Sequence, residues 1–223
     1  MLRFLTAGES HGRCMIAILE GIPAGLKIVL KQMNVELKRR QLGYGRGDRM
    51  KMEGDNVEIL SGVKNGLTLG SPIGLYVKNT DFRIDDLIPL TNPRPGHADL
   101  VGCLKYGYRD IRNVLERASA RETVSRVAIG SVCKLFLKEF GISIVSEVLM
   151  IGGEKNKEKV HKKIDQARKN LDTVGGMFSV TATGVPPGLG SYVSAEKRLN
   201  ARLAGVLMSI PAIKVVEVGL GTG

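Results

Sequence analysis

Residues Arg117–Glu122 read Arg-Ala-Ser-Ala-Arg-Glu, and apolar side chains then recur at helical spacing as far as Phe136. Ser119 followed three residues later by Glu122 is the pattern of a capping box, in which both side chains accept hydrogen bonds from backbone amides where a helix starts. The sequence therefore predicts a helix over Ser119–Phe140 with one apolar face.

The start of this predicted helix is also a candidate seat for an anion. Backbone N–H groups and the positive end of the helix dipole would meet there with Arg117 and Arg121. Alternatively the box only caps the helix, and the Glu122 carboxylate fills the seat. A cap does not require the three arginines of this segment, which include Arg126. Both interpretations stay open at this point.

Outward from this segment, strand-like and helix-like patterns alternate. Strands are predicted at Cys14–Leu19, Val57–Leu60, Ser71–Val77, Ile142–Met150, Met177–Thr183 and Lys214–Val218. The first of these is continuously apolar, which predicts a buried strand. Further helices are predicted at Val35–Arg40, Lys155–Leu171 and Ala195–Ser209. Mixed α and β structure in one compact unit follows.

Length and composition restrict the class of protein. The chain has 223 residues, of which 43% are apolar, enough to bury a core in one domain or two joined ones. It shows neither a run of about 20 apolar residues nor a signal peptide, so we expect a cytoplasmic protein. Cys14, Cys103 and Cys133 are widely spaced, and this predicts neither a disulfide framework nor a metal site.

The formal net charge of +11 favours an anionic partner, whether nucleic acid, a membrane surface or a phosphorylated small molecule. Lysines concentrate in Glu154–Lys169, which reads as an amphipathic helix with a solvated face that includes His161. Arginines instead stand beside glycines, with Arg40 and Arg46 around the Gly43–Gly47 run. Guanidinium groups bind phosphate bidentately, so this pattern fits a phosphate site, and it fits a surface turn equally well.

The run Gly8-Glu9-Ser10-His11-Gly12 fits two chemistries. It matches the Gly-x-Ser-x-Gly pattern of a serine-hydrolase nucleophile elbow, and it could instead present His11 as an acid with Ser10 in support. In an α/β hydrolase the nucleophile follows earlier strands and an oxyanion loop, whereas only seven residues precede Gly8. The elbow is therefore the weaker interpretation.

Four separate motifs in this order and spacing resemble the chorismate synthase family, and the resemblance runs essentially from end to end. They are Gly8–Gly12, Arg94–Asp99, Arg117–Gly130 and Leu203–Ala212. The resemblance implies an α/β layered sandwich of antiparallel sheets flanked by helices, assembled as a homotetramer. It also implies a lyase that removes phosphate and a ring proton from 5-enolpyruvylshikimate 3-phosphate in a 1,4-elimination, giving chorismate. Reduced FMN is the implied cofactor, and NADPH is the reductant in members that reduce their own flavin.

The resemblance also implies roles for individual residues. His11 corresponds to the acid that protonates the leaving phosphate, and His97 to the group that manages the proton on the reduced flavin. A stretch that touches FMN corresponds to Arg117, Ala118 and Ser119. Positions that hold the phosphate of the substrate or of a nicotinamide cofactor correspond to Arg40 and Arg46.

The sequence departs from the family pattern in three respects. Asn200 stands where Asp is common, and Val215 stands where Gly is usual. Family members also continue beyond Gly223, and that part carries further flavin contacts and an acidic residue that assists proton removal. We therefore expect a single domain over residues 1–223 that lacks the family's C-terminal part. Such a chain is a fragment, or an inactive or partner-dependent relative.

A basic module that binds nucleic acid is an alternative of a different class. Aromatic residues make up only 4% of the chain and Trp is absent, so few side chains could stack on bases. The arginines cluster with His and Gly more than along one stripe. These features make nucleic acid the less favoured partner.

Overall fold

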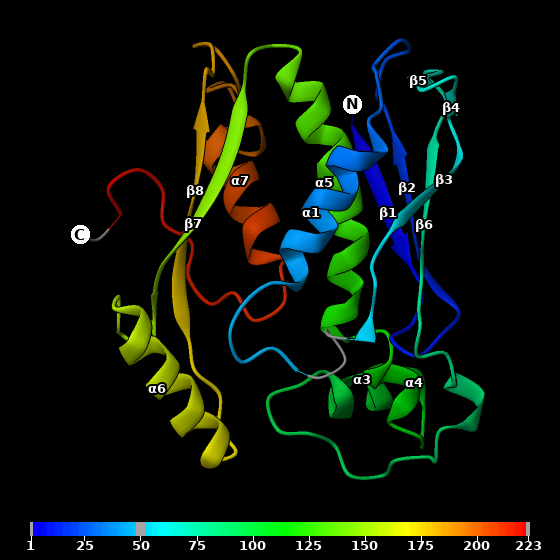
Figure 1. The fold of residues 1–223 in the computed structure, drawn as a ribbon, viewed down its shortest axis with the longest axis vertical. Coiled ribbons are helices and arrows are strands. Elements are labelled where there is room, and N and C mark those ends of the chain that lie inside the picture. The colour runs from blue at the N-terminus through cyan, green and yellow to red at the C-terminus, as the bar shows by residue number, and fades with distance from the viewer. Residues whose placement is uncertain (1, 48–51, 222–223) are drawn as a thin grey trace. The chain divides into compact units, whose positions relative to one another are not determined.

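A four-stranded antiparallel sheet forms the base of the core in the computed structural model, which describes residues 2–47 and 52–221. Its strands lie side by side in the order β1-β2-β6-β3 (Figure 1). Their bounds are Arg3–Ala7 for β1, Cys14–Glu20 for β2, Ile73–Lys78 for β6 and Val57–Ser61 for β3. Antiparallel pairing throughout confirms the predicted sheet type.

Strand β2 is buried on one face only. Met15, Ala17 and Leu19 lie in the core, whereas Ile18 is exposed. The expectation of a fully buried strand was wrong because the helices cover a single face of an antiparallel sheet, which can leave its other face to solvent. Alternate residues of β6 are buried in the same way as those of β2.

Two helices cover the buried face of the sheet. Helix α5 (Thr123–Lys138) contributes Val124, Ala128 and Val132, which are all completely buried. Helix α1 (Leu30–Gln41) packs on α5 through the buried residues Met33 and Leu37. These helices and the sheet together form one apolar core, which positions the loops at the ends of the strands.

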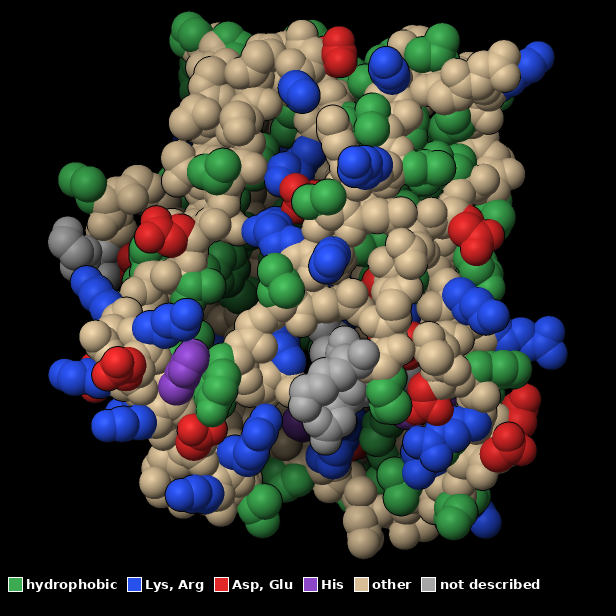
Figure 2. Space-filling model, viewed as in Figure 1, with side chains coloured by type: hydrophobic (Ala, Val, Ile, Leu, Met, Phe, Trp, Pro, Cys, Tyr) green, Lys and Arg blue, Asp and Glu red, His purple; other side chains and the backbone are tan. Residues whose placement is uncertain are grey.

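A second layer is built from strands β7 (Ser143–Ile151) and β8 (Gly176–Thr183), which pair antiparallel and are joined through helix α6 (Lys157–Lys169). Asn156 caps α6, because its side-chain oxygen accepts hydrogen bonds from the backbone amides of Glu158 and Lys159. Figure 2 shows Lys and Arg side chains gathered around α6, as its predicted solvated face requires. Tyr44 stacks on His161 of this helix, with ring centroids 3.8 Å apart.

The remaining elements of this unit are short. They are β4 (Val63–Lys64), β5 (Leu67–Thr68), the 3-10 turn Ile84–Asp86, α3 (Asp99–Tyr106), α4 (Arg112–Leu115) and the 3-10 turn Ala120–Glu122. Strand β1 and helices α3 and α4 were not predicted. Helices this short bury too few residues for an apolar period to be visible in the sequence.

The chain forms two compact units, Met1–Thr183 and Gly184–Gly223. The second unit contains the 3-10 turn Ala195–Lys197 and helix α7 (Leu199–Met208), separated by the extended backbone of Arg198. The single helix predicted over Ala195–Ser209 is therefore interrupted. The single domain expected over residues 1–223 stays a prediction.

The strand predicted at Lys214–Val218 is absent from the described part of the chain. Val215 and Val218 are largely exposed in this segment. A segment with alternating apolar residues forms a strand only where a neighbouring strand supplies hydrogen bonds to its backbone. None of the described sheets includes these residues. The prediction was wrong for that reason.

Helix α1 begins five residues earlier than the predicted Val35–Arg40, at Leu30. The predicted helix Ser119–Phe140 has a 3-10 first turn, followed by α5 over Thr123–Lys138. The layered α/β arrangement of antiparallel sheets and helices agrees with the predicted fold class. In the residues that the structure describes, every helix is too short or too polar to cross a lipid bilayer.

Candidate active site

The loop that joins β1 to β2 contains Gly8–Gly12, and the carboxamide of Asn79 makes three hydrogen bonds with its backbone. Asn79 lies just after β6 and is almost completely buried. Its Nδ2 atom lies 3.0, 3.2 and 2.7 Å from the carbonyl oxygens of Glu9, Ser10 and Gly12. Gly8 has φ +111°, and a Cβ atom there would collide with the carbonyl oxygen of Cys14, so this bend requires glycine.

Asn79 rests in turn on a buried ion network. The Asn79 Oδ1 atom accepts a hydrogen bond of 2.9 Å from Arg121 Nε, and Arg121 Nη1 donates to Asp55 at 2.6 Å. Arg121 Nη2 also lies 3.5 Å from Glu53, whose carboxylate accepts a hydrogen bond from the backbone amide of Thr80. The loop of the Gly8–Gly12 motif is therefore tied to the end of β6 and to the segment before β3.

This network corrects the expectation of an anion seat at Arg117–Glu122. Arg121 is 4% exposed and its charge is directed at Asp55 and Glu53. Arg126 forms an ion pair of 3.0 Å with Glu122 on the next helical turn. A ligand anion cannot reach Arg121 without displacing its carboxylates. Of the three arginines in this segment, Arg117 alone is exposed.

The capping box is only half formed. The Ser119 hydroxyl accepts a hydrogen bond of 3.3 Å from the backbone amide of Arg121, as a cap does. The Glu122 carboxylate does not reach back to Ser119, because it accepts hydrogen bonds from Thr6 at 2.8 Å and from Arg126. The capping box is incomplete because Thr6 and Arg126 hold the Glu122 carboxylate away from the backbone of Ser119.

His11 lies between two carboxylates. Its Nδ1 atom is 2.7 Å from Glu116 Oε2, and its Nε2 atom is 3.4 Å from Asp81 Oδ2. The backbone is fixed as well, because the carbonyl oxygen of His11 accepts hydrogen bonds from the amides of Arg83 and Ile84. The imidazole is 18% exposed, so it is both held and reachable from solvent.

The geometry of Ser10 contradicts a nucleophile elbow. An elbow presents its hydroxyl at a strand-to-helix turn, whereas Ser10 lies between two antiparallel strands and is only 3% exposed. Its hydroxyl oxygen accepts a hydrogen bond of 3.1 Å from the hydroxyl of Ser119. The serine-hydrolase hypothesis is therefore wrong, and the supporting role for Ser10 fits its burial.

His97 lies on an exposed loop just before α3. Its Nδ1 atom is 3.1 Å from the carbonyl oxygen of Pro95. Arg94 and Asp99 brace the loop by a bidentate contact, with Arg94 Nε and Nη2 donating to the carboxylate at 2.9 and 3.0 Å. The charge of Glu116 helps to raise the pKa of Arg94, after the larger effect of its hydrogen bonds to Asp99.

The hydrogen bonds from Arg94 lower the pKa of Asp99 below its ordinary value of 3.8. A carboxyl whose pKa is lowered on folding contributes stability above its unfolded-state pKa and loses it as the pH falls through the folded-state value. We expect the free energy of unfolding of the wild type to exceed that of Asp99→Asn by a margin that is widest above about pH 4 and shrinks below it. Urea denaturation at about pH 6 and about pH 3 measures this margin. A margin independent of pH would contradict the prediction.

Arg117, Ala118 and Ser119 lie directly beside the Gly8–Gly12 loop. Arg117 donates to the carbonyl oxygens of Thr6 at 2.9 Å and Gly8 at 3.2 Å, and its side chain stays exposed. Ser119 contacts Ser10, as described above. The structure therefore brings this predicted cofactor segment to the same loop as His11.

Arg40 and Arg46 differ in accessibility. Arg40 donates to Thr123 Oγ1 at 3.0 Å and to the carbonyl oxygen of Ala120 at 3.1 Å, and it lies 3.3 Å from Asp55. Burial lowers the pKa of Arg40, and the charge of Asp55 opposes that effect. Arg46 is exposed and donates to the carbonyl oxygen of Leu42 at 3.1 Å. The phosphate-binding roles of both stay predictions, and only Arg46 is open to a ligand here.

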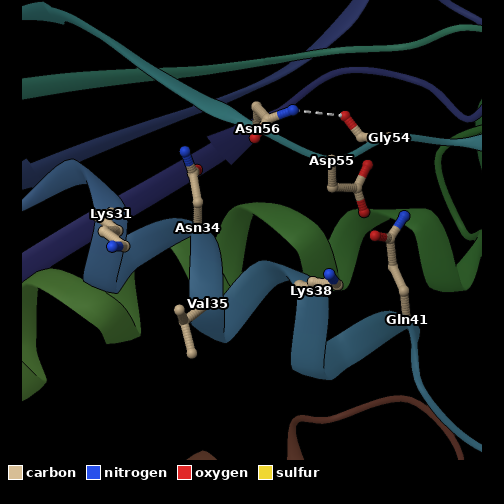
Figure 3. Close-up of a pocket in the computed structure, with 8 residues that line it drawn as sticks. All are labelled: Lys31, Asn34, Val35, Lys38, Gln41, Gly54, Asp55 and Asn56. Carbon is tan, nitrogen blue, oxygen red and sulfur yellow. Dashed lines mark hydrogen bonds between the residues drawn. The ribbon is translucent and has the colours of Figure 1, made fainter.

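A hollow beside α1 is a second candidate for a ligand-binding surface. Residues of α1 and of the segment before β3 line it: Lys31, Asn34, Val35, Lys38, Gln41, Gly54, Asp55 and Asn56 (Figure 3). The Asp55 carboxylate is bound to Arg121 and Arg40, and the Asn34 oxygen accepts a hydrogen bond from the backbone amide of Val57. Two exposed lysines supply no arrangement for proton transfer, so the candidate site is the loop that contains His11.

Sequence reasoning missed the residues that hold this loop. Asn79, Asp55 and Glu53 lie outside every quoted motif, and their pattern carries no period that marks them. Glu116 and Asp81 were missed too, although Glu116 directly precedes Arg117 in the motif segment. A carboxylate within a run of arginines is a signal that could have drawn attention to it.

This antiparallel α/β unit places His11, which contacts two carboxylates, on the loop that the exposed Arg117 also contacts. Side chains of these types can transfer a proton and bind an anion, and they define the candidate site. The family model for chorismate synthase matches residues 2–223. This chain therefore belongs to the chorismate synthase family.

The relatives and a solved structure agree with that assignment. The chorismate synthase of Carboxydothermus hydrogenoformans is 51% identical in an alignment that covers 99% of this chain and 67% of that protein. The chorismate synthase of Caldanaerobacter subterraneus is 53% identical over 223 residues, which cover 99% and 64%. A crystal structure of chorismate synthase has a TM-score of 0.83 at 44% identity and covers 99% of this chain and 69% of that one. The chain thus spans about two thirds of the length of these curated relatives.

Proposed function

We propose that this chain carries out the chorismate synthase reaction. In that reaction 5-enolpyruvylshikimate 3-phosphate loses its phosphate by cleavage of the allylic C–O bond and loses a ring proton, giving chorismate and inorganic phosphate. The observation that carries the proposal is His11, which is held by Glu116 yet reachable from solvent, in a chain of this family. Such an imidazole can give a proton to a departing phosphate.

Reduced FMN is the proposed cofactor, with NADPH as a reductant. Arg117, Ala118 and Ser119 would hold the flavin, since the exposed Arg117 guanidinium suits an anionic phosphate and the segment adjoins the loop of His11. When bound, reduced flavin lends electron density to the departing allylic phosphate.

The chain's own residues would bind and orient the substrate and move its protons. The exposed Arg46 would contact the phosphate of the substrate or of NADPH, and Arg40 would do so only after yielding contacts with protein groups. His97 would be the second proton-handling group. The carbonyl oxygen of Pro95 can only accept, so it favours a proton on Nδ1 of His97 and leaves Nε2 for exchange. A cytoplasmic homotetramer is proposed from the family alone.

Incubation of the 223-residue chain with 5-enolpyruvylshikimate 3-phosphate and reduced FMN, under exclusion of oxygen, tests this function. We expect chorismate and inorganic phosphate in equal amounts, with no net consumption of reduced flavin. Binding of both ligands without turnover would indicate an inactive or partner-dependent relative. Salt-sensitive RNA binding that the substrate does not affect would instead favour the basic binding module.

A further inference from the structure

Glu116 makes several separate contacts with the loop that carries His11. Its side chain is 2% exposed, and Oε2 accepts hydrogen bonds from the backbone amide of His11 at 3.0 Å and from the ring at 2.7 Å. Its backbone carbonyl oxygen accepts a further hydrogen bond from the amide of Ser10 at 2.8 Å. A buried carboxylate has thus been placed on one nitrogen of this imidazole.

The contact determines which nitrogen carries the fixed proton. An ionised carboxylate can only accept hydrogen bonds, so the short contact requires a proton on Nδ1 of His11. The other nitrogen, Nε2, is then the atom at which His11 gains and loses its exchangeable proton. Nε2 lies 3.4 Å from Asp81 Oδ2, and the Asp81 side chain is 22% exposed.

Glu116 makes the closer of the two carboxylate contacts with the ring, at 2.7 Å against 3.4 Å for Asp81, and each carboxylate has an arginine beside it. Arg112 Nη1 lies 3.6 Å from Glu116 Oε1, one helical turn away, so this carboxylate also has a cation as a partner. Oε2 makes both contacts with His11, and in the described residues Oε1 accepts no hydrogen bond. On the other side, Arg83 pairs with Asp81 at 2.9 Å.

We propose that Glu116 is a positioning residue for His11. It holds the ring in the tautomer with Nδ1 protonated, so that Nε2 is the nitrogen that delivers the proton to the leaving phosphate. The role of the proton rests on the proposed function, whereas the tautomer is a property of the unliganded chain. A carboxylate that orients an imidazole in this way is used by catalytic triads, where loss of the charge disrupts the tautomer.

The first test is a ¹⁵N NMR spectrum of the histidine rings in the unliganded 223-residue chain. His97→Gln and His161→Gln each remove one set of signals and thereby assign those of His11. We expect the neutral form of His11 to carry its proton on Nδ1 in the wild type. A neutral form protonated on Nε2 would overturn the proposal, whether or not the chain makes chorismate.

The second test replaces the carboxylate with an amide of the same size. Glu116→Gln removes the charge, and we expect loss of the fixed tautomer together with a drop in kcat of up to about 10⁴-fold, the effect of the same change at the orienting carboxylate of a catalytic triad, at nearly constant KM. Glu58→Gln, on the exposed side of β3, is the matched control and should retain the wild-type spectrum and kcat. A wild-type tautomer and wild-type kcat in Glu116→Gln would show that Glu116 only ties the loop to α4.

Discussion

Replacement of Arg121 by methionine should lower the free energy of unfolding by about 3–5 kcal/mol, the usual cost of removing one partner from a buried ion pair. Methionine retains most of the length of the side chain but none of its charge. Asp55 and Glu53 would stay buried, with Arg40 as the remaining cation of the network. Such a loss is a large fraction of the 5–15 kcal/mol that stabilises a typical domain. Urea denaturation monitored by circular dichroism measures it.

Arg39→Met is the matched control for this prediction. Arg39 is 56% exposed and pairs with Glu36 at 3.0 Å on its own helix and with Ser146. An exposed pair of this kind contributes about 1 kcal/mol or less. If Arg121→Met and Arg39→Met unfold at the same urea concentration, the network around Asn79 does not stabilise the fold.

The elements that could be predicted from the sequence are those whose apolar residues repeat over several turns or positions. Helix α5 and strand β6 each place such a period against a single apolar core, so their residue types alone indicate their structure. Helices α3 and α4 rest instead on local contacts, including the bond between Arg94 and Asp99. The start of α7 was also missed, because the extended backbone at Arg198 leaves no mark in the spacing of apolar residues.

The candidate site shows a different limit of sequence reasoning. His11 and Arg117 could be identified because they stand in family motifs, and the structure brings both to one loop. The sequence could not distinguish Arg121 from Arg117, because a guanidinium is a ligand site or a buried structural ion depending on its partners. The partner of Arg121, Asp55, lies 66 residues earlier in the chain. The +11 charge therefore overstates the number of arginines available to a ligand.

The buried and exposed arginines have complementary roles. Arg121 and Arg40 share Asp55, so the loop at Asn79 and the turn at Ala120 are fixed by one ion network. Binding an anion at Arg46 or Arg117 need not disturb that network, since both are exposed. The proton transfer proposed for His11 would require such a preorganised loop, because a displacement of about 1 Å can reduce the rate by about a hundredfold.

His97→Ala should lower kcat by about 10²- to 10⁴-fold, which is the usual contribution of a positioned acid–base group. Its ring is exposed and its single described hydrogen bond goes to Pro95, so the change should alter the free energy of unfolding by only about 0.5 kcal/mol. A loss of turnover at unchanged stability would therefore reflect chemistry and not unfolding. The rate of chorismate formation at saturating substrate and reduced flavin measures the effect.

His161→Ala is the matched control for His97→Ala, because it deletes an imidazole that stacks on Tyr44 at the surface of α6. The Tyr44 hydroxyl keeps its hydrogen bonds to Asp165 at 3.0 Å, so the local fold should persist and kcat should stay within about threefold of the wild type, the ordinary effect of a surface substitution. Near-normal kcat in His97→Ala would remove this residue from the reaction. Turnover would then depend on His11 alone among the histidines, since the chain contains only three.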